Sequence, residues 1–356
     1  MLGLSFAAQP EHETISVRRI ETYPFQIQIR HRESPLIPSF TRLSELVESL
    51  EIKFVRHSEK IRIGPAGWSY KDWEGVVYPA KPGTKFDPLA YLADFFDTIE
   101  INSSFYGPPL ASTTKSWLKR VLRNPKFVFT AKLFQAFTHQ RGKATRADEK
   151  AFREGMEPLT DAGKLGALLL QFPWSFKNTD DDRSYFYKLL DQFKEYPLVV
   201  EVRHVSWNDP RVFESLEERG VGVCNIDQPL FSKSVRPAAL TTSPVGYVRL
   251  HGRNYQDWFR ASAPRNDRYN YLYSVNELDP WIDRIKQIAR HTRETYVITN
   301  NHFRGKAVVN AIEIKAAVEE RAVPAPAPLF AEYERLRESA TVSDSGGEPE
   351  PGLFAQ

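Results

Sequence analysis

Charged side chains recur at regular positions in short apolar segments of this chain. Residues 98–102, 199–203 and 247–251 each place charged or polar side chains at alternating positions, with Val, Ile or Leu between them. Side chains of a β-strand alternate between its two faces, so Glu201 shares a face with Arg203, and Arg249 shares one with His251. Isolated buried charges cost several kcal/mol each. Charges on such strands must therefore be paired with one another or used in a site.

The ionisable side chains near the ends of these and neighbouring strands are the candidate catalytic residues. They are Glu100, Glu201, Lys132 and Asp227. Two carboxylates in different surroundings can hold different protonation states, which favours general acid/base chemistry by Glu100 and Glu201. The alternative is a purely structural salt-bridge network with Arg203 and Arg249. Lys132 could form a Schiff base or act electrostatically, but a salt-bridge partner is the favoured interpretation because nothing in the sequence shows a lowered pKa.

A second group of side chains could hold a substrate. The forked guanidinium groups of Arg203 and Arg249, with His204 and His251 nearby, would suit a phosphate or carboxylate, and ion pairing with the local acids is the equal alternative. Aromatic side chains after the predicted strands could stack on a sugar or base, or could pack the loops. These aromatic residues are Trp68, Tyr70, Trp73, Phe105, Tyr106 and Trp207. The candidate substrate-binding residues are Trp68, Tyr70, Asn102, Tyr106, Gln171, Arg203, His204, Trp207, Arg249, His251, Asn300 and Asn301.

Metal and thiol chemistry have weaker support. Glu100, Glu201, Asp227, His204 and His251 are suitable ligand types for a divalent metal, which is the alternative that we keep. Basic side chains on neighbouring strands would compete for the same carboxylates, however, and no compact His-Glu-x-x-His spacing occurs. We therefore expect no metal and no other cofactor. The single cysteine, Cys224, lies in an apolar run, which excludes an internal disulfide and favours an inert core position.

Short β-type runs alternate with helical patterns through the middle of the chain. The runs are residues 61–64, 98–101, 127–131, 167–171, 198–202, 221–226, 247–250 and 295–299. Helical patterns lie between most of them, for example residues 88–96, 211–219 and 278–285, the last with Asp279 as the expected N-cap. Eight such units in about 260 residues predict a single (β/α)₈ TIM-type barrel of class α/β. An open doubly wound sheet is the alternative, but no Gly-x-Gly-x-x-Gly follows the first run.

The ends of the chain differ from this middle region. We expect an N-terminal extension over residues 1–57, the barrel over 58–322, a Pro-rich connector and terminal helix over 323–338, and a disordered acidic tail over 339–356. The tail carries too little apolar surface to fold on its own. Active sites of barrel enzymes lie at the carboxyl ends of the strands. The polar strand ends of the middle region therefore predict the position of the site.

Composition limits the classes of partner. The chain has 356 residues with 48 Lys and Arg against 45 Asp and Glu, a formal net charge of +3, and no block of basic residues. This argues against a nucleic-acid partner, because phosphate binding usually shows a larger basic excess. No run of 18 apolar residues predicts a membrane span, and the single cysteine fits a reducing compartment, so we expect a cytoplasmic protein. Nothing in the sequence indicates its oligomeric state.

Several motifs resemble a known family. Residues 67–73 (GWSYKDW) and 100–106 (EINSSFY) are similar to the opening signatures of the YecE-like family, domain of unknown function 72, which is described as a (β/α)₈ barrel. Further matches follow in order at residues 131–132, 137–139, 170–173, 201–204 with Trp207, 247–252, 268–269 with 271–273, and 300–301 with Gly305 and 310–311. His302 stands where the family usually has an acidic residue. The resemblance implies the fold and the position of the site more than a reaction, because the family has no established one.

These observations lead to one expectation with two alternatives. We expect an enzyme that uses acid/base carboxylates and an Arg/Lys/His anion site on a small anionic substrate, either phosphorylated or sugar-like. A metal-dependent phosphoesterase or nuclease on the same barrel is the first alternative. A barrel that binds a ligand without turnover is the second.

Overall fold

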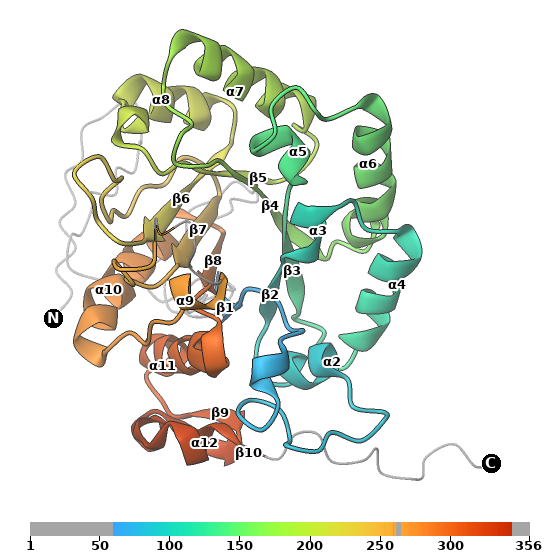
Figure 1. The fold of residues 1–356 in the computed structure, drawn as a ribbon, viewed down its shortest axis with the longest axis vertical. Helices are drawn as coiled ribbons and strands as arrows, with labels where there is room; N and C mark the ends of the chain where they lie inside the picture. Colours follow the sequence, from blue (N-terminus) through green and yellow to red (C-terminus); the bar gives the residue numbers. More distant parts are fainter. Residues whose placement is uncertain (1–59, 259, 261–264, 344–356) are drawn as a thin grey trace, which may run out of the picture. The chain divides into compact units, whose positions relative to one another are not determined.

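The computed structural model describes residues 60–258, 260 and 265–343, and its centre is a sheet of eight parallel strands with helices outside (Figure 1). The order of hydrogen-bonded neighbours is β1-β8-β7-β6-β5-β4-β3-β2. This is the predicted (β/α)₈ barrel, and each predicted apolar run contributes one strand. The strands are β1 (Ile61–Pro65), β2 (Thr98–Ile101), β3 (Val128–Lys132), β4 (Leu165–Gln171), β5 (Leu198–Glu201), β6 (Gly222–Asp227), β7 (Val245–Leu250) and β8 (Glu294–Thr299).

Alternation along the strands divides the apolar side chains into two clusters. Ala167 and Leu169 of β4 belong to the smaller cluster, which fills the barrel interior together with Cys224 and Ile226 of β6. Leu168 and Leu170 point the other way and join the larger cluster between strands and helices. Both faces of the strands are thus buried, as is usual for parallel sheets covered by helices. Cys224 is an interior core residue, as expected.

The barrel is nearly closed between its first and last strands. β1 pairs in parallel with β8, from Ile61 opposite Thr295 to Pro65 opposite Thr299. β1 and β2 share no ladder, and they are joined beyond β1 by the Gly67 amide, which donates to the Glu100 carbonyl at 2.9 Å. The chain therefore closes this side of the barrel next to Glu100.

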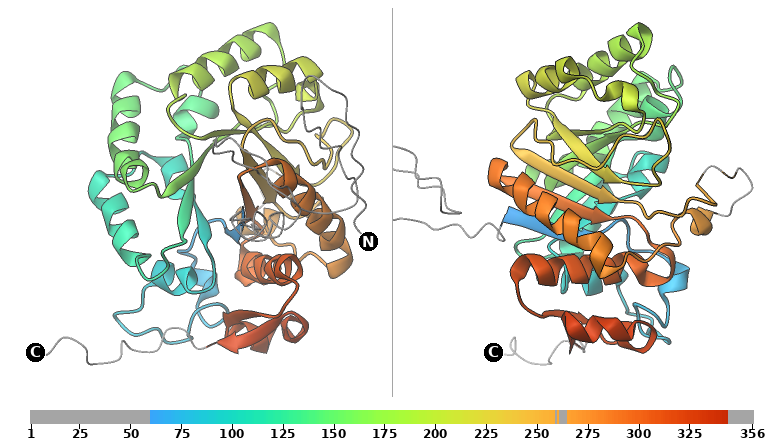
Figure 2. Two further views of the ribbon diagram at one scale, coloured as in Figure 1. Left: turned by 180° about the vertical axis from the view of Figure 1, so that it is seen from behind. Right: turned by 90° about the vertical axis from the view of Figure 1, so that its left-hand side faces the viewer.

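Helices surround the strands in both views of Figure 2. Most connections carry one or two helices, but β6 and β7 are joined by residues 228–244 without any helix. The helices are α2 (Pro88–Ala93), α3 (Ser103–Tyr106), α4 (Ala111–Arg120), α5 (Gln135–Thr138), α6 (Arg146–Asp161), α7 (Asp180–Gln192), α8 (Pro210–Glu218), α9 (Arg265–Arg268), α10 (Val275–His291) and α11 (Lys306–Glu319). Short 3₁₀ helices are η2 (Lys71–Trp73), η3 (Val205–Trp207) and η4 (Phe303–Gly305). In the part of the chain that is described, no helix is long and apolar enough to cross a membrane.

Side-chain caps explain where several helices begin. The Asp87 carboxylate accepts from the amides of Leu89 and Ala90 at the start of α2. The prediction of Asp279 as an N-cap is wrong, because α10 begins at Val275 with a capping box between Ser274 and Glu277. In that box the Glu277 carboxylate accepts from the Ser274 amide at 2.9 Å, so the helix begins before Pro280, which then lies inside it.

The C-terminal region differs from its prediction in two places. The Pro-rich connector forms β9 (Val323–Pro326), which pairs in parallel with β10 (Ala340–Ser343), so the first residues of the predicted tail are ordered in a strand. The predicted terminal helix is divided at Tyr333 into α12 (Leu329–Glu332) and the 3₁₀ helix η5 (Glu334–Glu338). Figure 2 shows this layer beyond α11. The predicted N-terminal extension and the rest of the tail lie outside the described residues.

Candidate functional site

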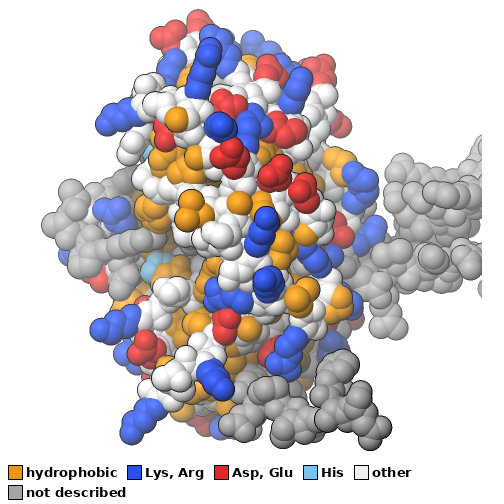
Figure 3. Space-filling view, turned by 90° about the vertical axis from the view of Figure 1, so that its right-hand side faces the viewer, with side chains coloured by type: hydrophobic (Ala, Val, Ile, Leu, Met, Phe, Trp, Pro, Cys, Tyr) orange, Lys and Arg blue, Asp and Glu red, His pale blue; other side chains and the backbone are white. Residues whose placement is uncertain are grey.

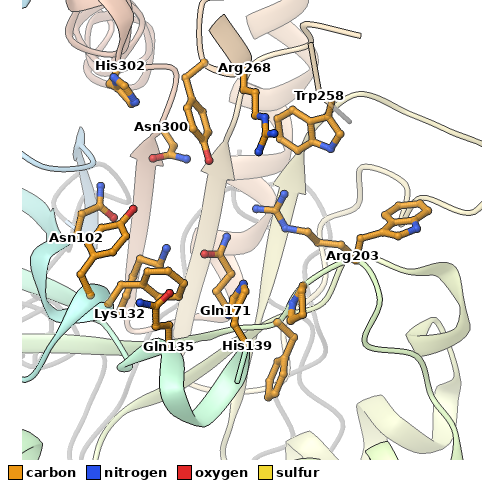
Figure 4. A pocket seen from close by; sticks show the side chains of 16 residues that line it. Asn102, Lys132, Gln135, His139, Gln171, Arg203, Trp258, Arg268, Asn300 and His302 are labelled. Atoms are coloured by element: carbon orange, nitrogen blue, oxygen red, sulfur yellow. The ribbon is translucent and has the colours of Figure 1, made fainter. Parts of the chain in front are cut away.

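A cavity of about 350 Å³ opens at the carboxyl ends of the strands. Asn102 follows β2, Lys132 ends β3, Gln171 ends β4, and Arg203 and Asn300 follow β5 and β8. Their side chains converge on one space (Figure 4). The predicted site residues in its wall are Asn102, Tyr106, Lys132, Gln171, Arg203 and Asn300. Parallel strands bring these positions together because all their carboxyl ends meet at one edge of the barrel.

A buried chain of ion pairs lies beneath the cavity. Arg249 donates to the Glu100 carboxylate at 2.7 Å and to the Glu201 carboxylate at 2.6 Å. Arg203 donates to the other oxygen of Glu201 at 2.6 Å and reaches the cavity wall. Glu100 and Glu201 have no exposed surface, and neither lines the cavity. The structure therefore places both predicted acid/base carboxylates in a charge-balanced floor.

The electrostatics of this floor oppose proton exchange at Glu201. Burial alone would raise the pKa of Glu201, but the guanidinium groups of Arg249 and Arg203 hold it well below its usual range. The Gln171 side-chain amide also donates to this carboxylate at 2.7 Å. A carboxylate held in its charged form by several donors is a poor general acid near neutral pH.

His251 completes the floor as a neutral imidazole. Burial, together with Arg203 and Arg249, lowers the pKa of His251 to about 3, although Glu201 acts in the opposite direction. The Asn300 side-chain amide lies 3.0 Å from Nδ1, and the Glu201 carboxylate lies 3.2 Å from Nε2. With its proton on Nε2, the imidazole accepts from Asn300 at Nδ1 and donates to Glu201 at Nε2. The Arg203 and Arg249 nitrogens, 3.3 Å and 3.5 Å from Nε2, then donate to the carboxylates alone. His251 thus links Asn300 in the cavity wall to the buried ion pairs.

Lys132 differs from the other cations of the site. Lys132 is only 8% exposed, and its Nζ lies 3.9 Å from the centroid of the Phe105 ring. Among the described residues no carboxylate oxygen lies within 4.0 Å of Nζ, so the interpretation of Lys132 as a salt-bridge partner does not match the structure. Burial and then the nearby Arg249 lower the pKa of Lys132 to about 7. Both effects disfavour the protonated amine, while the carboxylates of Glu100 and Glu201 favour it more weakly.

His139 shares this environment. It lines the cavity, and its ring packs edge-on against Phe105 with centroids 4.9 Å apart. Burial, and then the charge of Lys132, lower the pKa of His139 to about 4. The imidazole is therefore neutral at physiological pH and can accept or donate a hydrogen bond toward the cavity.

The connection between β7 and α10 supplies the wall opposite the strands. Trp258, Arg268 and Tyr269 of this connection line the cavity. The indole ring of Trp258 lies against Arg203, with 5.5 Å between the guanidinium carbon and the ring centroid. Arg268 donates to the Arg260 carbonyl at 3.0 Å, while its buried Nε has no partner among the described groups. Arg203 and Arg268 thus approach the cavity from different walls (Figure 4).

Asp227 lies on the opposite side of its strand from the cavity. Cys224 and Ile226 face the barrel interior, so Asp227 points outward, where it accepts from Arg253 at 2.9 Å and from the Trp281 indole at 3.1 Å. Asp227 is a candidate in the sequence only because it ends a strand, where polar side chains are expected to face the cavity. In β6 the polar side chains of Asn225 and Asp227 alternate with Cys224 and Ile226, and it is the apolar pair that faces the barrel interior.

Other predicted residues also stand outside the cavity wall. The Trp207 indole donates to the Phe176 carbonyl at 2.9 Å and stacks on the Phe176 ring, which is the loop-packing alternative. Asn301 points away from the interior and donates to the Tyr271 carbonyl at 2.8 Å. The rest lie beside or below the cavity: Trp68 packs on Trp117, Tyr70 stacks on His302, His204 contacts Ser206, and Arg249 and His251 lie in the floor.

The cavity also contains residues that were not candidates. They are Phe105, Gln135, His139, Phe172, Pro173, Trp174, Trp258, Arg268, Tyr269 and His302. For Phe105 the sequence indicates only an aromatic residue after a strand. His139, Arg268 and Tyr269 lie in motifs that carried the family resemblance, and that signal could have identified them. Gln135 and Trp258 come from connections with no such signal.

The described residues do not assemble a metal site. No group of three His, Cys, Asp or Glu side chains among them is arranged to hold an ion. Glu100 and Glu201 form ion pairs with Arg249. Asp227 lies on the face of β6 that points away from the barrel interior, where it pairs with Arg253. The metal-dependent alternative therefore has no ligand set in the described part of the chain.

Comparisons with known proteins agree with this fold and these motifs. A sequence model of the family described as "Protein of unknown function DUF72" matches residues 62–331. The chain belongs to the DUF72 family. The UPF0759 protein YunF of Bacillus subtilis is 28% identical over 264 residues, covering 70% of this chain and 92% of that protein. The family resemblance inferred from the motifs is confirmed.

Solved DUF72 structures show the same barrel. A DUF72 family protein of Thermotoga maritima is 33% identical with a TM-score of 0.64, covering 73% of this chain and 99% of that one. One from Enterococcus faecalis is 26% identical with a TM-score of 0.63, covering 73% and 95%. In this DUF72 protein, the motifs of the resemblance meet at the cavity, to which they contribute Lys132, His139, Gln171, Arg203, Arg268 and Asn300.

Proposed function

We propose that this DUF72 protein binds a small anionic organic molecule in the cavity at the carboxyl ends of its strands. One observation carries the proposal: the described residues that line the cavity include Lys132, Arg203 and Arg268 but no Asp or Glu. The carboxylates of the floor, Glu100 and Glu201, are neutralised by Arg249 and Arg203. The positive charge that the floor does not balance therefore comes from Arg268, and from Lys132 when its amine is protonated. An anion would meet this charge, and guanidinium groups bind phosphate or carboxylate well.

The shape and lining of the cavity support a ligand of sugar-phosphate size. Its volume of about 350 Å³ lies at the lower end of the range for small-molecule sites. Tyr269 and Trp258 offer aromatic faces, and Asn102 and Asn300 offer amides that can bind hydroxyl groups. A phosphorylated, sugar-like molecule would use both the cations and these polar groups. This interaction calls for no metal and no cofactor.

The role that we propose for Glu100 and Glu201 is support rather than proton exchange. Both are fully buried, and together they hold Arg249, while Glu201 also orients Arg203. Orienting a cation beforehand lowers the cost of binding, because less side-chain freedom is lost. This supporting role of the two carboxylates is equally consistent with a barrel that binds its ligand without turnover.

The surface charge supports a small molecule over a nucleic acid. On the face drawn in Figure 3, Lys and Arg side chains are interspersed with Asp and Glu. The formal net charge is only +3. Binding to a phosphate backbone usually requires an extended basic surface.

Calorimetric titration with glucose 6-phosphate, inorganic phosphate and glucose tests this proposal. We expect the two anions to bind and glucose, the uncharged counterpart, to bind much more weakly. Arg268→Gln removes one charge-assisted contact and should weaken the binding of glucose 6-phosphate by about 10- to 100-fold. Arg290→Gln changes an exposed arginine at the end of α10 and is the matched control. Equal affinity for glucose, or an unchanged affinity in Arg268→Gln, would contradict the proposal.

A further inference from the structure

The amine of Lys132 is not needed as a fixed charge in the ion-pair floor. Each arginine of the floor has a carboxylate partner, at 2.6 Å or 2.7 Å. Among the described groups, Nζ of Lys132 has neither a carboxylate within 4.0 Å nor a hydrogen-bond acceptor, and it rests on the Phe105 ring. The same amine stands in the cavity wall (Figure 4). A buried lysine without an anion is costly, whereas Met or Leu would pack there without that cost.

The surroundings also favour the uncharged amine. Burial is the largest cause that lowers the pKa of Lys132 to about 7, and Arg249 and Arg203 act in the same direction; together these outweigh Glu100 and Glu201, which act in the opposite one. At neutral pH the unprotonated fraction is then on the order of a thousand times that of an ordinary lysine. An amine needs its free electron pair to attack a carbonyl carbon.

We propose that Lys132 is a nucleophilic amine that forms a reversible imine with the carbonyl group of an anionic aldehyde or ketone held in the cavity. The inference deepens the anion-binding function proposed above and rests on it. Arg203 and Arg268 would hold the acidic group of the ligand, while the carbonyl carbon would face Nζ of Lys132.

The reaction balances without any other reactant. The electron pair of Nζ forms a bond to the carbonyl carbon, and the π electrons of the carbonyl move to its oxygen. A proton passes from nitrogen to that oxygen, which gives a carbinolamine. The carbon–oxygen bond then breaks, the hydroxyl leaves as water with the second nitrogen proton, and the nitrogen pair closes the C=N bond. One carbonyl and one amine become one imine and one water.

Reduction with cyanoborohydride near neutral pH tests the inference by converting an imine into a stable secondary amine. The probes are pyruvate as an anionic carbonyl, propanal as an uncharged carbonyl, and lactate as an anion without the carbonyl. A modified Lys132 resists trypsin, so its adduct would appear on the peptide of residues 127–141. We expect pyruvate and propanal to modify Lys132 before any other lysine, and lactate to leave it unchanged.

Variants separate the nucleophile from its surroundings. Lys132→Arg keeps the positive charge without a nucleophilic amine and should lose the adduct. Lys164→Arg is the control, because burial also lowers the pKa of Lys164 but this residue precedes β4, at the other end of the strands. It should leave labelling of Lys132 unchanged. Peptide mapping of the unaltered protein decides the question even where a variant does not fold.

The possible outcomes distinguish the two proposals. Labelling by propanal spread over surface lysines, with none preferred at Lys132, would overturn the imine inference whatever anion binds. Calorimetric binding of glucose 6-phosphate together with that result would leave the anion-binding function standing. Preferential labelling of Lys132 by propanal without binding of any anion would support the nucleophile and contradict the anion site.

Discussion

Arg249 joins two strands that lie far apart in the sequence. Its guanidinium reaches Glu100 of β2 and Glu201 of β5, and all three side chains are buried. Such a network adds little stability over an apolar core while it is intact, but it becomes costly when one member is removed. The remaining charges then have neither water nor a partner.

Replacing Arg249 with Gln should therefore destabilise the protein by about 3–5 kcal/mol at neutral pH. The loss should shrink as the pH falls toward 4.5, the ordinary pKa of Glu201, because protonated carboxyls no longer need the cation. In the unaltered protein the pKa of Glu201 is lowered, so its stabilising contribution is present above that pH and disappears below it. Urea unfolding at several pH values measures both effects. Arg290→Gln should change stability by less than about 0.5 kcal/mol.

Lys132 should show the opposite relation between pH and stability. Its pKa is about 7 in the folded state and 10.5 as an ordinary lysine, so the folded protein binds fewer protons between these values. Stability should rise with pH across that interval. Lys132→Met should thus be more stable than the unaltered protein by a few kcal/mol below pH 7, and the gain should vanish above pH 10.5. A gain independent of pH in urea unfolding would show that packing, not charge, is responsible.

At the scale of elements, one buried carboxylate fastens the connection between β7 and α10. Asp227 accepts from Arg253 near the start of this connection and from the Tyr273 hydroxyl near its end. It also accepts from Trp281 of α10. The residues between Arg253 and Tyr273 include Trp258 and Arg268 of the cavity wall. Asp227, which the sequence suggested as catalytic, thus holds in place the segment that carries this wall, from the side that faces away from the cavity.

Asp227→Asn should loosen this connection while the strands stay intact. An amide cannot accept from Arg253 as strongly as a carboxylate does, so we expect a loss of about 2–4 kcal/mol. Amide hydrogen exchange should become faster over residues 253–258 and 267–273 and remain slow in β2–β5. Affinity for glucose 6-phosphate should fall as well, because the loosened connection carries Trp258 and Arg268 of the cavity wall. The matched control is Asp191→Asn, because Asp191 is exposed and lies 3.9 Å from its partner Arg219, which is too far for a hydrogen bond.

At the scale of the molecule, the barrel depends on a close approach between β1 and β2. These strands share no ladder, and a Cβ atom added to Gly64 would lie 1.9 Å from the Thr98 carbonyl oxygen. The backbones can come this close only because residue 64 has no side chain. The approach closes the barrel beside Glu100, at the edge of the ion-pair floor.

Gly64→Ala should therefore be strongly destabilising, by about 3 kcal/mol or more, because both clashing groups are fixed backbone or Cβ atoms. Thermal and urea unfolding measure this loss. Gly83→Ala is the matched control, since a Cβ there meets nothing within 4 Å. Equal stability of the two variants would show that β1 and β2 can separate without cost.

The amino-acid sequence determined the strands, their order along the chain and the end of the barrel at which polar groups gather. These features are local, because apolar runs and alternation are set by neighbouring residues. The alternation in β5 and β7 thus placed Glu201, Arg203 and Arg249 together correctly. The tertiary structure alone decided how deep each charge lies: Glu201 is sealed in the floor while Lys132 reaches the cavity. It also turned Asp227 away and brought in Arg268, because burial and contacts between distant segments depend on how all strands and connections pack at once.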